Sequence, residues 1–177
     1  PLGKQAAARL EALARDALGL KAAREIELPI VLPNELAGRG AAPLRDLAGR
    51  ALALGGDGNH DLAELIRAHI RSHRQLPAVL TQSAPAWQDD LHPQGGWLHS
   101  RSGHQLHAYH LLPSEAALEK EFGTLSTRLA YLFERCMLNA LPVEAGTDAD
   151  GKDRAVHWFY AFAPGADTIL HCPVCGY

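Results

Sequence analysis

The chain has 177 residues, the size of one domain and enough to bury a core, with 47% apolar and 21% charged residues. Its formal net charge of −3 does not suggest the basic surface of a protein that mainly grips nucleic acid, so we expect no DNA partner. We also expect a cytoplasmic protein without a membrane partner, because no apolar run approaches the roughly 20 residues of a membrane span, no leader pattern opens the sequence, and three cysteines do not suggest a disulfide framework.

The first part of the chain predicts helices and short strands. Residues 4–18 are rich in helix formers with leucines on one face, and Gly19 ends this helix. Residues 24–33 alternate apolar and charged side chains, which predicts a strand that Pro29 and Pro33 confine to the edge or end of a sheet. The next segments predict a loop with a short helix over 34–49, a short strand over 50–56 and a helix over 60–73.

The middle of the chain predicts a hairpin followed by the longest helix. Residues 77–87 and 103–112 are predicted as two strands joined by a loop that contains glycine and proline. Ser114 is the expected N-cap of a helix that runs to Leu138. The apolar stripe of this helix predicts core packing by Leu118, Phe122, Leu125, Leu129, Leu132 and Cys136.

The last part predicts three more strands, near residues 141–145, 154–162 and 167–172, with a polar loop over 146–153. We find no internal repeat and no linker. The order of elements therefore predicts an α+β fold, with an antiparallel sheet flanked by helices, in one domain over residues 1–177.

Four segments match the motifs of one known family in a fixed order. They are SHRQLPAVLTQ at residues 72–82, YLFERCMLNALPVEAG at 131–146, ADTILHCPVCGY at 166–177 and EIELPIVLPNELAGRG at 25–40. The first segment resembles the S-Y-R-Q-L-P lead into motif 2 of class II aminoacyl-tRNA synthetases, in particular bacterial-type prolyl-tRNA synthetase. The second is similar to the F-E-R-C-G-L segment of that family with its V-E-A-D, and the third to its E-D-x-I-x-x-C-x-x-C-x-Y stretch. The fourth resembles motif 1. The resemblance covers nearly the whole chain and implies a class II synthetase-like catalytic core.

This resemblance also implies partners and cofactors. Motif 1 builds the dimer interface in the family, so residues 25–40 imply a homodimer. The family activates an amino acid with ATP, which implies ATP and Mg²⁺. Motif 3, which carries the family's second ATP arginine, would lie beyond Tyr177, so we expect the chain to lack it. Anticodon recognition also lies outside the matched region, so the match identifies no tRNA contact.

The motif 2 positions that hold the nucleotide are altered in this chain. The family's F-R-D-E-x-R-P-R-x-G matches residues 87–96, and its three arginine positions hold Gln88, His92 and Gln94. The following R-G-R-E-F matches residues 99–103, so only one of its two arginines is kept. Arginine suits phosphate because its forked guanidinium is permanently charged, whereas histidine is mostly neutral at pH 7. By the match, the candidate nucleotide-binding residues are Gln88, Asp90, His99 and Arg101.

The amino-acid pocket is altered too. The family's T-H-E signature, which holds proline, matches residues 57–59, and its later S-H-E-F matches residues 155–158. The candidate pocket residues by this match are Asp57, Asn59, His157 and Trp158. Positions that build the fold are kept and positions that carry the reaction are changed. This pattern favours a pseudoenzyme: a homologue that does not activate proline and instead binds a ligand or a protein partner in an accessory or regulatory role.

Two alternatives remain. The chain could belong to an ATP-dependent amino-acid ligase that adenylates a different substrate or uses a different acceptor. It could also be the N-terminal part of a longer tRNA synthetase. ATP–pyrophosphate exchange separates the first alternative from the pseudoenzyme, and the length of the full gene product decides the second.

Histidines and cysteines form two further groups. His171, Cys172 and Cys175 have metal-ligand spacing, but a structural zinc site needs four ligands and no second pair lies nearby in the sequence, so zinc is not expected. Five histidines lie in and around the predicted hairpin: His92, His99, His104, His107 and His110. Strand alternation places His104 and His110 on one face and His107 on the other. The pattern favours polar lining of a cleft over a metal or pH-sensitive site.

Overall fold

The fold is built around a long hairpin. The computed structural model describes residues 2–36, 41–55, 59–87, 101–145, 155–160 and 168–170, together with Cys172 and Val174. Strands β5 (Ala78–Trp87) and β6 (Ser102–Leu111) pair antiparallel along their whole length. The short strand β1 (Arg24–Glu25) joins β5 in parallel, so the sheet order is β1-β5-β6. The hairpin agrees with the two strands predicted over 77–87 and 103–112.

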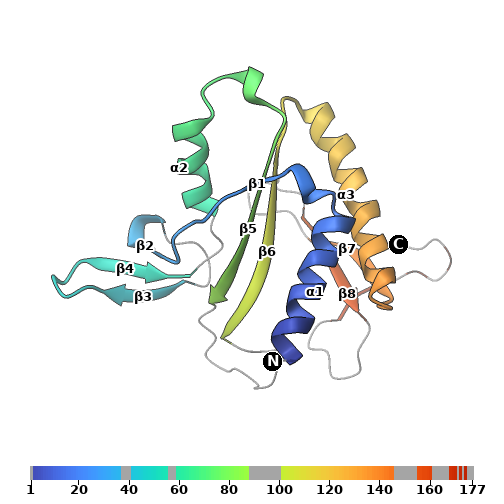
Figure 1. The fold of residues 1–177 in the computed structure, drawn as a ribbon, viewed down its shortest axis with the longest axis horizontal. Helices are drawn as coiled ribbons and strands as arrows, with labels where there is room; N and C mark the ends of the chain where they lie inside the picture. The colour runs from blue at the N-terminus through green and yellow to red at the C-terminus, as the bar shows by residue number, and fades with distance from the viewer. Residues whose placement is uncertain are drawn as a thin grey trace.

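Two helices cover one face of the hairpin (Figure 1). α1 (Leu2–Ala17) and α3 (Glu115–Arg135) lie side by side and contact each other. As the sequence predicts, Ser114 caps α3, because its Oγ accepts a hydrogen bond from Ala117 N at 3.3 Å. α1 ends just before Gly19, whose φ of 73° lies in the left-handed region. The Arg128 guanidinium of α3 then donates to the Leu18 carbonyl at 2.9 Å and fixes the end of α1.

A second, smaller sheet stands beside the hairpin. It consists of β2 (Val31–Pro33), β4 (Ala51–Leu54) and β3 (Ala42–Arg45), paired antiparallel in that order. Leu32 and Ala53 are buried in this region, and α2 (Asn59–His69) follows with Leu62 buried. Gly55 N donates to Ile30 O at 2.9 Å, so the end of β4 holds the segment that leads into β2.

The last described pair of strands follows α3. β7 (Ala140–Ala145) and β8 (Ala155–Tyr160) form an antiparallel pair, and the Trp158 ring lies 5.3 Å from the Phe133 ring of α3. Together these elements confirm the predicted α+β class, with antiparallel sheets and helices. In the part of the chain that the structure describes, no helix is long and apolar enough to span a membrane.

The single strand predicted over residues 24–33 is wrong. The structure has two short strands, β1 and β2, separated by the irregular residues 26–30. This segment leaves the sheet because its backbone groups are bound by other elements: the Leu28 carbonyl by the Gln82 side chain and the Ile30 carbonyl by Gly55 N. Pro29 between them has no N–H to donate to a ladder.

Five smaller predictions also need correction. Residues 42–45, predicted as part of a loop, form β3, which tolerates Pro43 because it is an edge strand. α2 ends at His69 rather than at residue 73, because Ser72 caps a separate 3₁₀ turn over His73–Gln75. The long helix ends at Arg135, and its predicted core residue Leu118 is 50% exposed. The described residues 168–170 are not in a strand.

Candidate active-site cleft

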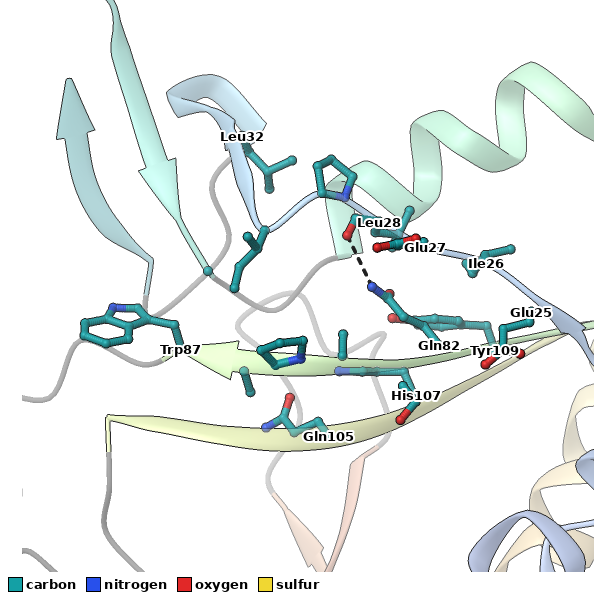
Figure 2. Close-up of a pocket in the computed structure, with 17 residues that line it drawn as sticks. Glu25, Ile26, Glu27, Leu28, Leu32, Gln82, Trp87, Gln105, His107 and Tyr109 are labelled. Carbon is teal, nitrogen blue, oxygen red and sulfur yellow. Dashed lines mark hydrogen bonds between the residues drawn. The ribbon is translucent and has the colours of Figure 1, made fainter. Parts of the chain in front are cut away.

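A cavity of about 910 Å³ lies over the face of the hairpin opposite α1 and α3 (Figure 2). Strand pairing places Gln82 of β5 directly opposite His107 of β6, and alternation puts Gln105 and Tyr109 on the same face. The irregular segment after β1 forms the other wall. The described lining residues are Glu25, Ile26, Glu27, Leu28, Pro29, Ile30, Leu32, Gly55, Gln82, Ser83, Ala84, Pro85, Ala86, Trp87, Gln105, His107 and Tyr109.

One buried amide holds the two walls together. Gln82 is only 6% exposed, and its Nε2 donates to the Leu28 carbonyl at 3.3 Å. Ile26 N donates to the Thr81 carbonyl at 2.8 Å on the same segment. Leaving the Leu28 carbonyl unpaired at this buried position would cost about 1–3 kcal/mol. The amide therefore fixes the width of the cleft, and its Oε1 remains as an acceptor beside the cavity.

The floor of the cleft carries two parallel rings. The His107 and Tyr109 rings have centroids 5.9 Å apart and an interplanar angle of 8°. Burial lowers the pKa of His107 below the ordinary imidazole range, because the charged form is poorly solvated there. The imidazole is therefore neutral at neutral pH and keeps one nitrogen as a hydrogen-bond acceptor.

Trp87 closes one end of the cavity. Its indole Nε1 is buried, and no hydrogen-bond partner for it lies among the described residues. Gly55 lies against this residue: a Cβ on Gly55 would come within 2.7 Å of the Trp87 carbonyl oxygen, and the φ of Gly55 is 75°. Only glycine fits here, so the end of β4 can approach the hairpin closely.

The charged side chains on the described walls of the cavity are acidic. Glu25 and Glu27 line it, and no lysine or arginine does among the residues that the structure describes. Arg15 of α1 neutralises Glu25 through an ion pair with Nη2–Oε1 of 3.0 Å. Glu27 is exposed. A charge pair 4 Å apart in water is worth about 1 kcal/mol, so Glu27 repels an anionic ligand and attracts a cationic one by that order.

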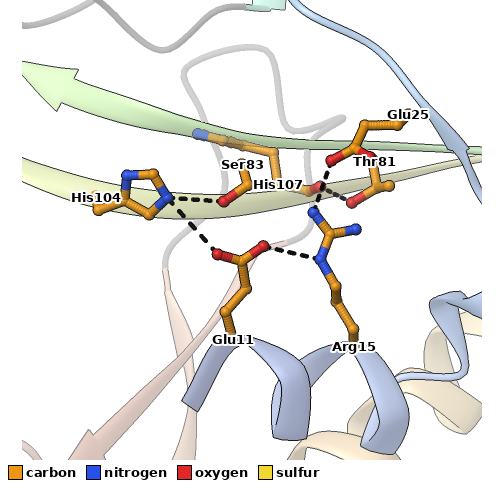
Figure 3. Close-up of polar contacts among 7 residues, drawn as sticks. All are labelled: Glu11, Arg15, Glu25, Thr81, Ser83, His104 and His107. Atoms are coloured by element: carbon orange, nitrogen blue, oxygen red, sulfur yellow. Dashed lines mark hydrogen bonds and ion pairs between the residues drawn. The ribbon is translucent and has the colours of Figure 1, made fainter. Parts of the chain in front are cut away.

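The opposite face of the hairpin has a polar cluster that binds α1 (Figure 3). His104 Nε2 lies 2.7 Å from Ser83 Oγ and 3.7 Å from Glu11 Oε2, and Arg15 Nε donates to Glu11 Oε1 at 2.9 Å. The Arg15 and Ser83 hydrogen bonds hold the pKa of Glu11 below the ordinary glutamate range. A nucleophilic triad places serine and carboxylate on different imidazole nitrogens, but here both approach Nε2. The cluster is therefore structural.

The predicted faces of the hairpin histidines are confirmed within the described residues, but of His104, His107 and His110 only His107 lines the cavity. His104 and His110 lie on the helix-covered face, where His110 Nδ1 is 3.0 Å from Glu121 Oε1 of α3. His107 lies on the cavity face. His92 and His99 fall outside the described residues.

The described residues that match the nucleotide and amino-acid positions of the family do not line the cavity. Arg101 is exposed just before β6, and Asn59 begins α2. His157 is exposed on β8, while Trp158 packs on Phe133 of α3. Outside the described residues lie Asp57, Gln88, Asp90, His99, His171 and Cys175.

Of the three candidate zinc ligands, the structure describes Cys172 alone, and this residue is half-buried. Within the described part of the chain, no group of three or more histidine, cysteine or acidic residues could hold a metal. His171 and Cys175 lie outside that part.

Motif matching missed the polar residues that line the cavity, because Glu27, Gln82 and Tyr109 belong to no altered motif position. A signal for two of them was present: strand alternation from His107 places Tyr109, and its partner Gln82, on the same face. Glu27 could not be found this way because its segment is irregular.

Comparison with known proteins identifies this architecture. No family model matches the chain. Curated relatives align over its full length: the proline–tRNA ligase of Desulfitobacterium hafniense at 30% identity and that of Thermotoga neapolitana at 27%. The chain is a homologue of prolyl-tRNA synthetases. It spans 32% of the length of each of these relatives.

Solved prolyl-tRNA synthetases share the fold of this homologue. The Cryptosporidium parvum enzyme complexed with L-proline and AMP superposes with a TM-score of 0.73 at 11% identity, over 84% of this chain and 33% of that one. The Giardia lamblia enzyme in complex with prolyl-adenylate gives 0.69 at 12% identity, over 78% of this chain and 32% of that one. The predicted class II synthetase-like fold is therefore confirmed.

Proposed function

We propose that this prolyl-tRNA synthetase homologue binds a small ligand in its cleft without activating proline, and so acts as an accessory or regulatory protein. Activation transfers a carboxylate onto the α-phosphate of ATP, and the negative charge that develops must be neutralised. The cavity supports ligand binding, because its walls carry a buried amide and half-buried imidazole and indole groups.

The observation that carries the proposal is the charge of the cleft. Its described walls present Glu25 and Glu27 without a lysine or arginine among them. The motif 2 loop adds to this argument, because three arginine positions of the family hold Gln88, His92 and Gln94. Loss of one preorganised donor costs about 3 kcal/mol of transition-state stabilisation, so the combined loss removes activation.

ATP–pyrophosphate exchange tests the proposal. The natural protein that carries this chain is assayed with Mg²⁺ and proline, then with each other amino acid, beside the Thermotoga neapolitana relative as a positive control. We expect no exchange above background with any amino acid. Exchange with proline would overturn the proposal. Exchange with another amino acid would establish an ATP-dependent ligase of altered specificity instead, with ATP and Mg²⁺ as its cofactors.

The chain spans only part of the length of its relatives, and this favours a second candidate function. Because it covers 32% of their length, the same sequence also fits the N-terminal part of a longer synthetase. The mass of the protein produced from the native gene decides this question. A product about three times longer than this chain, with proline-dependent exchange, would support the longer synthetase.

A homodimer through the motif 1 region is the assembly we propose. Two neighbouring apolar side chains there are open to solvent: Ile30 is 41% exposed and Val31 is 42% exposed. Burial of such side chains at an interface is favourable by about 25 cal/mol per Å². Analytical ultracentrifugation should therefore show a dimer, and Val31→Asp should shift it toward the monomer. An unchanged monomer in both cases would exclude this interface.

A further inference from the structure

A second cavity, of about 570 Å³, lies near the end of the hairpin where β6 leads into α3 (Figure 1). It shares no described lining residue with the cleft, and His110, on the helix-covered face of the hairpin, is part of its wall. We propose that this cavity, the α2–α3 pocket, binds a small neutral molecule that has an apolar body and a hydroxyl donor, such as a phenol. The inference goes beyond the proposed function and does not rest on it.

The walls of the α2–α3 pocket are mainly apolar. Ile66 of α2, Ile70 just after it, and Leu118 of α3 line the pocket. His73 Nε2 donates to the Pro113 carbonyl at 3.2 Å, which ties the segment after α2 to the start of α3. Leu118 belongs to the apolar stripe of α3 and yet is 50% exposed, so an apolar ligand would cover a side chain that the fold leaves open. The volume lies within the range of small-molecule sites, about 300–1,000 Å³.

His110 supplies an acceptor whose orientation is fixed. Its side chain is 10% exposed, and its Nδ1 lies 3.0 Å from Glu121 Oε1. An ionised carboxylate only accepts hydrogen bonds, so Nδ1 carries the hydrogen of this contact, and the neutral ring keeps Nε2 as an acceptor that points away from Glu121. Nε2 is buried, and it has no hydrogen-bond partner among the described residues. A buried acceptor without a partner is unfavourable, and a donor on a ligand would remove that cost.

The same wall determines how a ligand enters and which charge it carries. The His110 side chain lines the pocket while its Nε2 is covered, so the ligand reaches this atom by displacing a neighbouring side chain. Leu118 can move in this way, because exposed side chains change rotamer within nanoseconds. Apolar walls would remove water from a charged group without replacing it, which favours a neutral ligand. Glu115 on the pocket wall and Glu121 beside His110 also disfavour an anion.

Three fluorinated probes of similar shape test the inference by ¹⁹F relaxation with the natural protein that carries this chain. 4-Fluorophenol has the hydroxyl donor, 4-fluorotoluene has a methyl group in its place, and 4-fluoroanisole keeps the oxygen as an acceptor without the donor. We expect 4-fluorophenol to bind with a submillimolar Kd, about ten-fold more tightly than the other two probes, although both of those are more hydrophobic.

A matched pair of variants locates the site. Leu118→Trp fills the pocket and leaves the cleft unchanged, so it should weaken binding of 4-fluorophenol about ten-fold or more. Leu10→Trp makes the same change at a leucine of α1 that is 54% exposed, and it should leave the affinity unchanged. His110→Phe keeps a ring and removes Nε2, so it should lower the affinity for 4-fluorophenol to that for 4-fluorotoluene.

Four results would each overturn the inference: 4-fluorotoluene or 4-fluoroanisole binding as tightly as 4-fluorophenol, unchanged affinity of the Leu118→Trp variant, a folded His110→Phe variant that keeps the full affinity, or no binding of 4-fluorophenol at millimolar concentration. His110→Phe leaves Glu121 without its imidazole partner, so circular dichroism is used to verify that the variant folds. If it does not fold, the three probes and Leu118→Trp decide the question without it.

Discussion

The two faces of the β5–β6 hairpin use the same kinds of polar residue for different purposes. On the helix-covered face, the His104 and His110 side chains each lie beside a carboxylate from a helix, Glu11 of α1 and Glu121 of α3. On the cavity face, the His107 ring makes no hydrogen bond to any described residue, and Gln82 keeps an acceptor oxygen. Histidines three residues apart on one strand thus lie on opposite faces, two of them packing against helices and His107 open to a ligand.

This difference means that substitutions on the two faces should affect different quantities. The helix-covered face should control the free energy of unfolding, because its polar groups bind separate elements together. Apart from Gln82, which binds the two walls of the cleft together, the cavity face should control ligand affinity with little effect on stability. The following predictions test that separation, from the largest expected effect to the smallest.

Glu121→Ala should destabilise the protein by about 1–3 kcal/mol, because it removes a partner from a buried imidazole. The His110 side chain is 10% exposed, its Nδ1 faces Glu121 at 3.0 Å, and its Nε2 has no partner among the described residues. Urea unfolding followed by circular dichroism measures the change. Glu121→Gln retains an acceptor, so its loss in free energy of unfolding should be about half that of Glu121→Ala.

A control on the same helix is Glu134→Ala, at an exposed position of α3. It should change the free energy of unfolding by less than about 0.5 kcal/mol. Equal effects of Glu121→Ala and Glu134→Ala would show that the His110 contact contributes nothing, and the contrast between the two faces would be lost.

Acid should weaken the contact between α1 and the hairpin. The pKa of Glu11 is lowered in the folded state, so its contribution is present above the unfolded glutamate pKa of about 4.3 and is lost as the pH falls through the folded value. The expected loss is about 1 kcal/mol, the net value of a typical hydrogen bond. Urea unfolding across pH 3 to 7 measures it.

Two variants identify the source of this acid sensitivity. Glu11→Gln should remove about 1 kcal/mol of pH-dependent stability, and Arg15→Met should do so as well, because Arg15 is the main cause of the lowered pKa of Glu11. If the two losses add fully in the double variant, the residues do not act as a pair.

His107→Gln should change stability by less than about 0.5 kcal/mol, because its ring makes no hydrogen bond within the described residues. Its effect should appear instead in the affinity of the cleft for a ligand, which should fall about two- to three-fold with the loss of an aromatic face. A loss of stability as large as that of Glu121→Ala would contradict the separation of the two faces.

Local sequence signals predicted much of the fold. Ser114 and the helix formers after it act within a few residues, so the start of α3 could be predicted. The break between β1 and β2 could not, because it depends on a hydrogen bond from Gln82, which is 54 residues away from Leu28. The edge strand β3 was missed because Pro43 is unusual in a strand, and only its pairing with β4 reveals why it is tolerated.

The candidate site was less predictable than the fold. Alternation correctly separated His107 from His104 and His110, because it depends only on strand geometry. The wall that contains Glu27 depends on how a segment folds across the hairpin, which no local pattern encodes. The motif matches Gln88, Asp90 and Asp57 lie outside the described residues and remain predictions.

The contact between Arg128 and the Leu18 carbonyl has a consequence for biosynthesis. These residues are 110 positions apart, and no described residue of α1 is fully buried even in the finished fold. During translation at about 5–20 residues per second, α1 leaves the ribosome several seconds before α3 exists to receive it. Leu2 and Leu10 are therefore open to chaperones during this interval, since both are more than half exposed even after folding.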